Sequence, residues 1–353
     1  MSVTLVEQRY RSVLRVLPAY YRAEREDEMV EAFLHGVPED VRDEARPSTG
    51  EVVSVLALAV RTRLGGAGAP ARYAVLGEAV RLFALLGVLL QAATVLSQRA
   101  LSLAWFSGAA TLDRQVALGA FGGGFVSAAL QVLAWALPFA WAGAYLALVR
   151  DRRRAAARLS AVAALPTLLT LGYQLFSPSY TGPVSDLAVV TALVCWLTVA
   201  AVACGFHEDA ASTPLPLVPP GLALMGLCVL SGAAGALLPL SLEAYGVSGA
   251  AVIAVGAGAL VVRVLRSGSS SAALPLALAA LGASVLAVWA TVLPVASQPG
   301  LPAAVAVGWP AETAVLSLLV LALAFTGVRD ARRTLASVRR QRGGGVEGKI
   351  ADR

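Results

Sequence analysis

Long runs of apolar residues separated by short polar segments dominate the chain from about residue 77 onward. A helix needs about 20 mostly apolar residues to cross the hydrocarbon core of a bilayer, which is about 30 Å thick. Windows of that length predict an all-α, polytopic membrane protein with about eight transmembrane helices. The predicted spans are residues 79–98, 125–149, 159–177, 186–206, 220–241, 247–265, 272–294 and 311–328.

The first 66 residues have a different pattern, in which apolar positions recur at helical spacing among many charged residues. The spacing predicts a first helix over residues 3–17, which Pro18 ends. It predicts a second helix from about Ala19 to His35, and Gly36 follows that helix where a left-handed residue is favoured. Half of the 22 acidic residues of the chain lie in its first 51 residues.

A third helix has a clear start signal, because Ser48 and Glu51 have the spacing of a capping box. A stripe of larger apolar residues follows and predicts the buried face of this helix: Val52, Val53, Leu56, Val60 and Leu64. We therefore expect four regions: a small N-terminal three-helix domain over residues 1–66, a linker over 67–78, a membrane bundle over 79–328 and a basic tail over 329–353.

The composition excludes a soluble enzyme fold. Hydrophobic residues make up 58% of the 353 residues and charged residues only 14%, whereas ordinary soluble domains have about 45–50% and about 25%. The hydrophobic core of a single soluble domain stops growing near about 250–300 residues. A soluble fold of this chain therefore could not bury so large an apolar surface. The lipid bilayer is therefore the expected first partner of the chain.

The distribution of the 28 Lys and Arg residues predicts the orientation in the membrane. With eight spans and both ends inside, only Arg99 and Arg114 face outward, in agreement with the excess of basic residues on the cytoplasmic side of membrane proteins. The loop 207–219 is also expected inside but has no Arg. The abundance of Arg over Lys is typical of GC-rich bacterial genomes, and no apolar signal-peptide core begins the chain. We therefore expect a bacterial inner-membrane protein with a cytoplasmic N-terminus, a cytoplasmic C-terminus and no nucleic-acid partner.

Residues able to perform chemistry are scarce, so the sequence predicts no catalytic residue, no cofactor and no metal ligand. The single Lys, Lys349, lies outside any phosphate-binding loop, which excludes nucleotide hydrolysis by that motif. A membrane enzyme would have only one candidate cluster, His207-Glu208-Asp209, and that cluster has too few ligands for a metal site. Three mid-span glutamines are expected to form hydrogen bonds between helices or, alternatively, to line a substrate path: Gln91, Gln131 and Gln174.

The segment Leu17-Pro18-Ala19-Tyr20-Tyr21-Arg22, followed by Glu24, Glu28-Met29 and Phe33-Leu34, resembles the helical prefix domain of bacterial multi-pass membrane proteins. This domain is known from permease-prefix proteins and from the helical family associated with anti-sigma factors. The resemblance covers about residues 1–60. It implies a cytosolic interaction module attached to a membrane unit, often in a regulatory context, and it brings no catalytic residues.

The acidic residues between Glu24 and Glu31 form either a solvated helix face or a docking face for a basic partner. The residues expected to bind a partner are Tyr21, Arg22, Glu24, Glu28 and Glu31. The leading hypothesis is a membrane sensor or scaffold whose N-terminal domain binds a cytosolic protein, including a transcription regulator. The alternative is the membrane subunit of a transporter or permease for an apolar or lipid-like substrate. The sequence leaves the ligand, the partner and the oligomeric state open.

Overall fold

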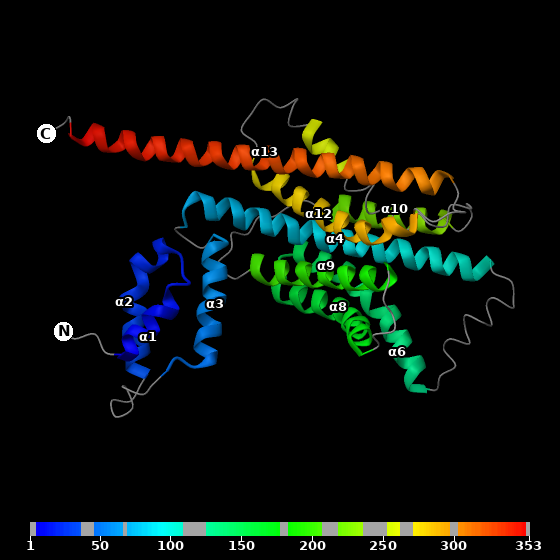
Figure 1. Ribbon diagram of the computed structural model, residues 1–353, viewed down its shortest axis with the longest axis horizontal. Coiled ribbons are helices and arrows are strands. Elements are labelled where there is room, and N and C mark those ends of the chain that lie inside the picture. Colours follow the sequence, from blue (N-terminus) through cyan, green and yellow to red (C-terminus); the bar gives the residue numbers. More distant parts are fainter. Residues whose placement is uncertain are drawn as a thin grey trace. The chain divides into compact units, whose positions relative to one another are not determined.

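The computed structural model describes residues 5–36, 46–65, 69–108, 125–176, 183–206, 218–235, 253–261, 271–296 and 303–350. Within these ranges all regular secondary structure is helical (Figure 1). The chain forms two compact units. The first unit consists of Met1–Val80, Cys204–Ala211 and Ala331–Arg353, and the second consists of Arg81–Ala203 and Ser212–Asp330.

In the first unit, three helices share one hydrophobic core: α1 (Leu5–Leu14), α2 (Ala19–Gly36) and α3 (Thr49–Arg63). We call these three helices the head. Their amphipathic spacing directs one apolar face of each helix inward. The rings of Tyr10 and Phe33 stack at the centre, 4.1 Å apart and nearly parallel. The buried core residues are Val6, Tyr10, Leu14, Leu17, Val30, Phe33, Val55 and Ala59.

The capping box at the start of α3 is confirmed. The Glu51 backbone N–H donates to Ser48 Oγ at 3.2 Å, and the Ser48 N–H donates to Glu51 Oε2 at 2.6 Å. These two bonds satisfy backbone donors that the first turn of a helix leaves without partners. The sequence therefore predicts the N-cap residue of α3, Ser48, correctly.

The predicted apolar stripe of α3 is buried only in part: Leu64 is buried, whereas Val53, Leu56 and Val60 are exposed. Val53 is 64% exposed and Leu56 is 45% exposed, whereas Val55 and Ala59 are 3% and 1% exposed. Thr62 continues this buried face because its hydroxyl donates to the Leu58 carbonyl at 2.9 Å and so brings no unsatisfied polar group inside. The inward face consists of small side chains, which lets the α3 backbone approach its neighbours. Hydrophobicity alone favoured the larger residues of the predicted stripe.

Two glycines allow the end of α3 to lie close to the start of α4 (Ala71–Gly108). Gly65 has a φ of 86°, a left-handed conformation that favours glycine. A Cβ at Gly77 would collide with the backbone carbonyl of Leu64, so only glycine fits this contact. The expected linker 67–78 differs from the structure over its second half, because residues 71–78 belong to α4.

Further helices follow α4 in the part of the chain that the structure describes, including a short helical segment over residues 253–261. The others are α6 (Phe125–Ala136), α7 (Ala140–Val149), α8 (Arg153–Phe176), α9 (Pro183–Gly205), α10 (Val218–Gly235), α12 (Ala273–Ala296) and α13 (Ala303–Ile350). A short 3-10 turn, η2 (Leu137–Phe139), joins α6 to α7 at Pro138, where the ring removes a backbone donor.

Within the described residues, five helices are long and apolar enough to cross a membrane. They coincide with five of the predicted spans and support a multi-pass membrane protein. Their apolar stretches are Ala71–Ala104, Val132–Val149, Asp186–Gly205, Ala273–Pro294 and Val307–Ser337. The predicted spans 159–177 and 220–241 overlap α8 and α10, and the predicted span 247–265 lies mostly outside the described residues.

Candidate functional site

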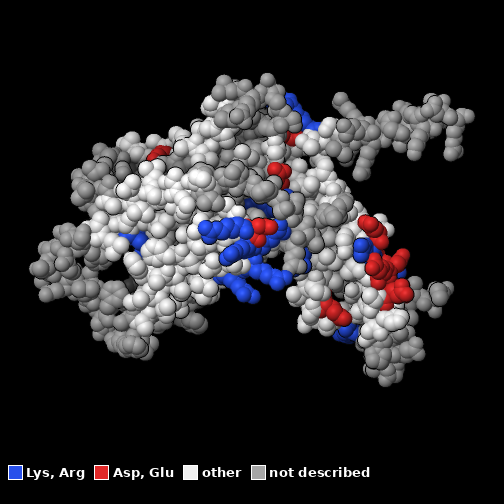
Figure 2. All heavy atoms as spheres, turned by 180° about the vertical axis from the view of Figure 1, so that it is seen from behind, with Lys and Arg blue, Asp and Glu red and all other residues white. Residues whose placement is uncertain are grey.

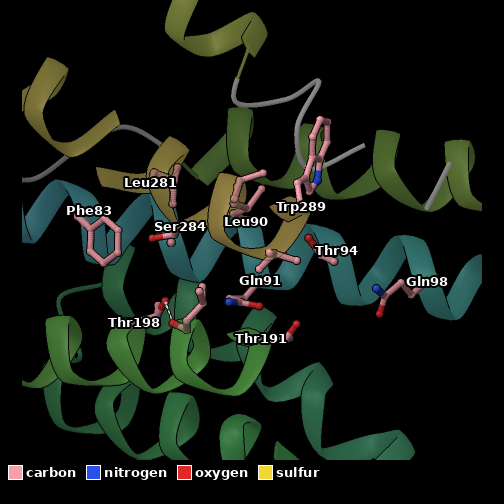
Figure 3. Close-up of a pocket in the computed structure, with 14 residues that line it drawn as sticks. Phe83, Leu90, Gln91, Thr94, Gln98, Thr191, Thr198, Leu281, Ser284 and Trp289 are labelled. Atoms are coloured by element: carbon pink, nitrogen blue, oxygen red, sulfur yellow. Dashed lines mark hydrogen bonds between the residues drawn. The ribbon is translucent and has the colours of Figure 1, made fainter. Parts of the chain in front are cut away.

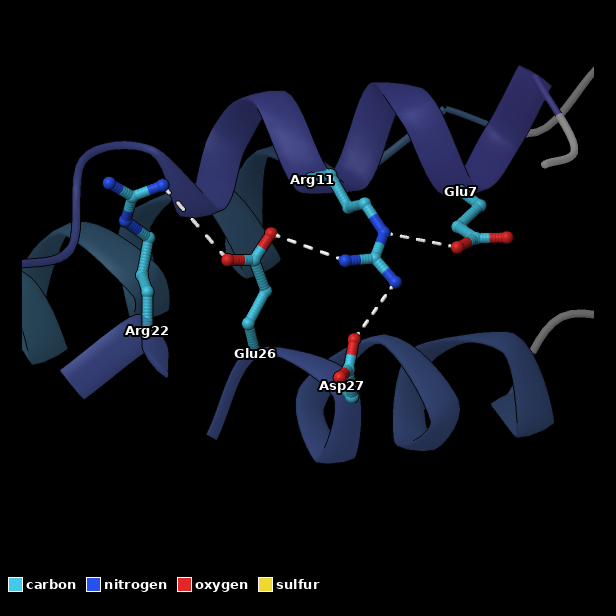
Figure 4. Close-up of polar contacts among 5 residues, drawn as sticks. All are labelled: Glu7, Arg11, Arg22, Glu26 and Asp27. Carbon is cyan, nitrogen blue, oxygen red and sulfur yellow. Dashed lines mark hydrogen bonds and ion pairs between the residues drawn. The ribbon is translucent and has the colours of Figure 1, made fainter. Parts of the chain in front are cut away.

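One candidate site lies on α2 of the head, where the acidic side chains divide into two groups. The first group surrounds Arg11 of α1 (Figure 4). Its guanidinium donates to Glu7 Oε1 and to Asp27 Oδ1 at 3.0 Å each, and to Glu26 Oε1 at 3.4 Å. The hydrogen bonds that Arg11 donates raise its pKa, with the bond to Glu7 as the largest cause and the bond to Asp27 as the next. These carboxylates therefore join α1 to α2.

The second group is the acidic face, which we define as Glu24, Glu28 and Glu31. All three side chains are exposed, and their spacing of four and three residues places them along one side of α2. Glu28 pairs with the exposed Arg25 at 3.4 Å, whereas Glu24 and Glu31 form no ion pair within the described residues. Acidic side chains gather on the surface of the head in Figure 2. None of the three side chains belongs to the buried core of the head.

The two remaining residues of the predicted partner-binding set are partly buried. Tyr21 packs against the core of the head and meets the Tyr20 ring edge-on, 6.4 Å between centroids. Arg22 lies 4.0 Å from Glu26, and its buried Nε has no hydrogen-bond partner within the described residues. Tyr21 and Arg22 thus have contacts within the head, and their role in binding a partner stays a prediction.

Two residues that organise this site were missed in the sequence. Arg11 could have been found, because it follows Glu7 by four residues, a spacing at which opposite charges pair on a helix. Tyr20 had no comparable signal. Its hydroxyl donates to the Thr62 carbonyl at 2.7 Å, a partner 42 residues away, and its ring lies 5.4 Å from that of Tyr73. Only the tertiary structure brings these groups together.

The buried Tyr10 and the half-buried Tyr20 predict a loss of head stability at alkaline pH. Burial, and then the charge of Glu51, raise the pKa of Tyr10, and burial is also the largest cause that raises the pKa of Tyr20. Above the ordinary tyrosine pKa of about 10 the folded head holds these protons more tightly than the unfolded chain, so stability falls as pH rises. Below that pH the contribution is fully present.

Hydrogen exchange of α1–α3 at increasing pH, corrected for the intrinsic exchange rate, measures this effect. The wild-type head should lose protection above about pH 10. The double variant Tyr10→Phe/Tyr20→Phe should show a flatter dependence, because phenylalanine carries no ionisable proton. An equally steep loss of protection in that variant would show that other groups cause it.

A second candidate site is a partly open cavity in the second unit, lined by residues of α4, α9 and α12 (Figure 3). Its volume is about 90 Å³, on a scale where roughly 10–15 Å³ admits one water molecule. The lining side chains of α4 lie between those of α9 and α12. The lining residues are Phe83, Gly87, Leu90, Gln91, Thr94, Gln98, Thr191, Val194, Thr198, Leu281, Ser284, Val285, Val288 and Trp289.

The cavity lining combines apolar side chains with polar side chains from all three helices, and we call the polar ones the polar wall. Gln91, Thr94 and Gln98 follow one face of α4 at helical spacing. The hydroxyls of Thr198 and Ser284 donate to carbonyls of their own helices, at 2.9 and 3.0 Å, so their oxygens remain as acceptors. The side chains of Gln91 and Gln98 form no hydrogen bond within the described residues.

The three predicted mid-span glutamines therefore have different positions. Gln91 lines the cavity, and Gln174 lies on α8 outside the lining. The side chain of Gln131 lies outside the described residues. Tertiary structure separates these residues, because their sequence environments are equally apolar.

The described residues contain no group of three His, Cys, Asp or Glu side chains placed to hold a metal ion. His207, Glu208 and Asp209, which formed the alternative enzyme cluster, lie outside the described residues. Comparison of the chain with family models, curated proteins and solved structures found no match.

Proposed function

We propose that the protein is a bacterial inner-membrane sensor or scaffold, and that its head binds a cytosolic partner with a basic surface. The observation that carries this proposal is the acidic face of Glu24, Glu28 and Glu31, which is exposed and is not needed for packing. The resemblance of this segment to a helical prefix domain supports the same function and favours a transcription-regulatory partner. In this proposal the chain is not an enzyme.

The separation of the two acidic groups is the physical argument. Arg11 forms ion pairs with Glu7, Glu26 and Asp27, and Arg22 also lies 4.0 Å from Glu26, so these carboxylates have partners within the head. Within the described residues, the acidic face forms one ion pair, between Glu28 and Arg25. Exposed charges of one sign steer a complementary partner toward the surface and accelerate its association. They also repel the anionic cytoplasmic leaflet, which favours a head that turns this face to the cytosol.

The proposed membrane arrangement has about eight spans with both ends in the cytoplasm. Five apolar helices support a multi-pass protein, and the strong bias of Arg in the sequence supports an even number of crossings. This arrangement leaves the three-helix head and the basic tail on the same side as a cytosolic partner.

Neutralising the acidic face is expected to abolish partner capture without unfolding the head. The full chain in its native membrane would be cross-linked to cytosolic proteins, and the variant E24Q/E28Q/E31Q compared with the wild type. Because binding depends on charge, capture should fall at least about tenfold in this variant and also with added salt.

The matched control is E24D/E28D/E31D, which keeps all three charges at the same positions and should retain most of the capture. Hydrogen exchange of α1–α3 in both variants verifies that the head stays folded. Equal capture by the wild type and the neutral variant would refute the docking role of the acidic face.

The second candidate function is a transporter or permease subunit for an apolar or lipid-like substrate. The cavity between α4, α9 and α12 favours it, since it combines amide and hydroxyl groups with apolar side chains inside the membrane unit. Flux of a lipid-like substrate through liposomes that contain the purified protein distinguishes this function from the first.

A further inference from the structure

The α4 residues that line the cavity between α4, α9 and α12 extend over a length close to the thickness of a bilayer core. The lining on this helix extends from Phe83 to Gln98, which is about 22 Å at 1.5 Å per residue. Arg81 and Arg99 flank this stretch and are about 27 Å apart along the helix, close to the roughly 30 Å of a hydrocarbon core. Gln91 therefore lies near the middle of the membrane.

The lining residues that the structure describes include no charged side chain. A charged ligand group at this depth would require an opposite charge, because moving an ion into hydrocarbon is costly without one. The cavity is therefore suited to a neutral ligand. This excludes lipids with phosphate heads as well-bound ligands of the cavity.

The polar wall requires a ligand that both donates and accepts hydrogen bonds. The oxygens of Thr198 and Ser284 can only accept, because their protons are used by the helix backbone. The Gln91 amide offers two donors and one acceptor, and it has no hydrogen-bond partner within the described residues. An amide left without partners in an apolar medium is unfavourable. A hydroxyl group satisfies both sides, whereas a carbonyl group can satisfy only the donors.

The apolar part of the lining is suited to a hydrocarbon chain. Leu281, Val285 and Trp289 of α12 are buried and give the cavity an apolar lining. The volume of about 90 Å³ holds a small polar head with several water-sized groups. The chains of such a ligand would extend from the cavity into the surrounding lipid.

We propose that this cavity binds the hydroxyl-bearing head of a neutral membrane lipid of the diacylglycerol class, with Gln91 as its main hydrogen-bonding residue. This proposal concerns binding alone and does not depend on partner docking by the head. The lipid assay below and the capture assay for the acidic face use different residues, so each can fail without the other.

Binding would be measured with the full chain in lipid nanodiscs, by the retention of labelled diacylglycerol in native mass spectrometry. Two related lipids test the chemistry: the methyl ether of diacylglycerol, which cannot donate a hydrogen bond, and phosphatidic acid, which is charged. Diacylglycerol should bind at least about tenfold more tightly than either. The methyl ether loses one buried hydrogen bond, and phosphatidic acid would bring a charge into an uncharged cavity.

The variant Gln91→Leu should weaken diacylglycerol binding about tenfold. Gln174→Leu is the matched control, because Gln174 is a partly buried glutamine of α8 outside the cavity. This variant should bind diacylglycerol as tightly as the wild type does. Thr94→Val keeps the volume of the side chain and removes only its hydroxyl, so it tests the polar wall even where Gln91→Leu fails to fold.

Three results would overturn the proposal. The first is binding of the methyl ether as tight as that of diacylglycerol. The second is unchanged affinity in both folded cavity variants. The third is retention of diacylglycerol no greater than that of the bulk phospholipid.

Discussion

Phe33→Ala should unfold the head while the membrane helices remain intact. The Phe33 ring is buried and stacks on Tyr10 at 4.1 Å, so its removal leaves a cavity at the centre of the only core shared by α1, α2 and α3 within the described residues. Truncation of a buried Phe costs about 3–5 kcal/mol. A core of this size rarely supplies more than about 3–5 kcal/mol in total, so the loss is comparable to the whole stability of the head.

Limited proteolysis of the full chain in detergent measures this effect. Cleavage within residues 5–65 should be slow in the wild type and fast in Phe33→Ala, with an unchanged fragment from the membrane helices. Val53→Ala is the control, because Val53 is 64% exposed and surface changes usually stay within about 0.5 kcal/mol. Equal protection of Phe33→Ala and the wild type would contradict a head held together by this core.

Gly232→Ala should destabilise the membrane unit, although alanine normally favours a helix. A Cβ at Gly232 of α10 would collide with the carbonyl group of Ser97 on α4, whose carbon would be only 2.9 Å away. The two backbones must separate, and such overpacking typically costs about 1–3 kcal/mol. Close contact between backbones is the usual reason for small residues at helix interfaces in membranes.

Gly226 of the same helix provides the matched control, because a Cβ there would meet nothing within 4 Å. Gly226→Ala should therefore raise the thermal stability in detergent slightly, by up to about 1 kcal/mol from helix propensity. Gly232→Ala should lower it. Two changes of the same sign would refute the predicted contact between α4 and α10.

The sequence predicts what depends on local pattern. The Ser48 capping box, the ends of α1 and α2 near Pro18 and Gly36, and five apolar spans follow from hydrogen bonding and hydropathy within short segments. Three of the five predicted partner-binding residues also belong to the exposed side of α2, because charged residues at helical spacing are rarely buried.

Features that depend on distant residues were not predictable. The inward face of α3 is Val55 and Ala59 rather than Val53 and Leu56, since the closeness of its neighbours decides which face is buried. Gln91 and Gln174 have similar apolar surroundings in the sequence, but only Gln91 lines the cavity.

The orientation of the chain in the membrane is the central claim, because a head outside the cytosol could not bind a cytosolic partner. Single cysteines at three exposed positions test it most directly: Ala32→Cys on α2, Asp186→Cys on α9 and Ser337→Cys on α13. In intact cells, a membrane-impermeant maleimide should label only Asp186→Cys, and permeabilised cells should show labelling at all three positions. Labelling of Ala32→Cys or Ser337→Cys in intact cells would contradict the account.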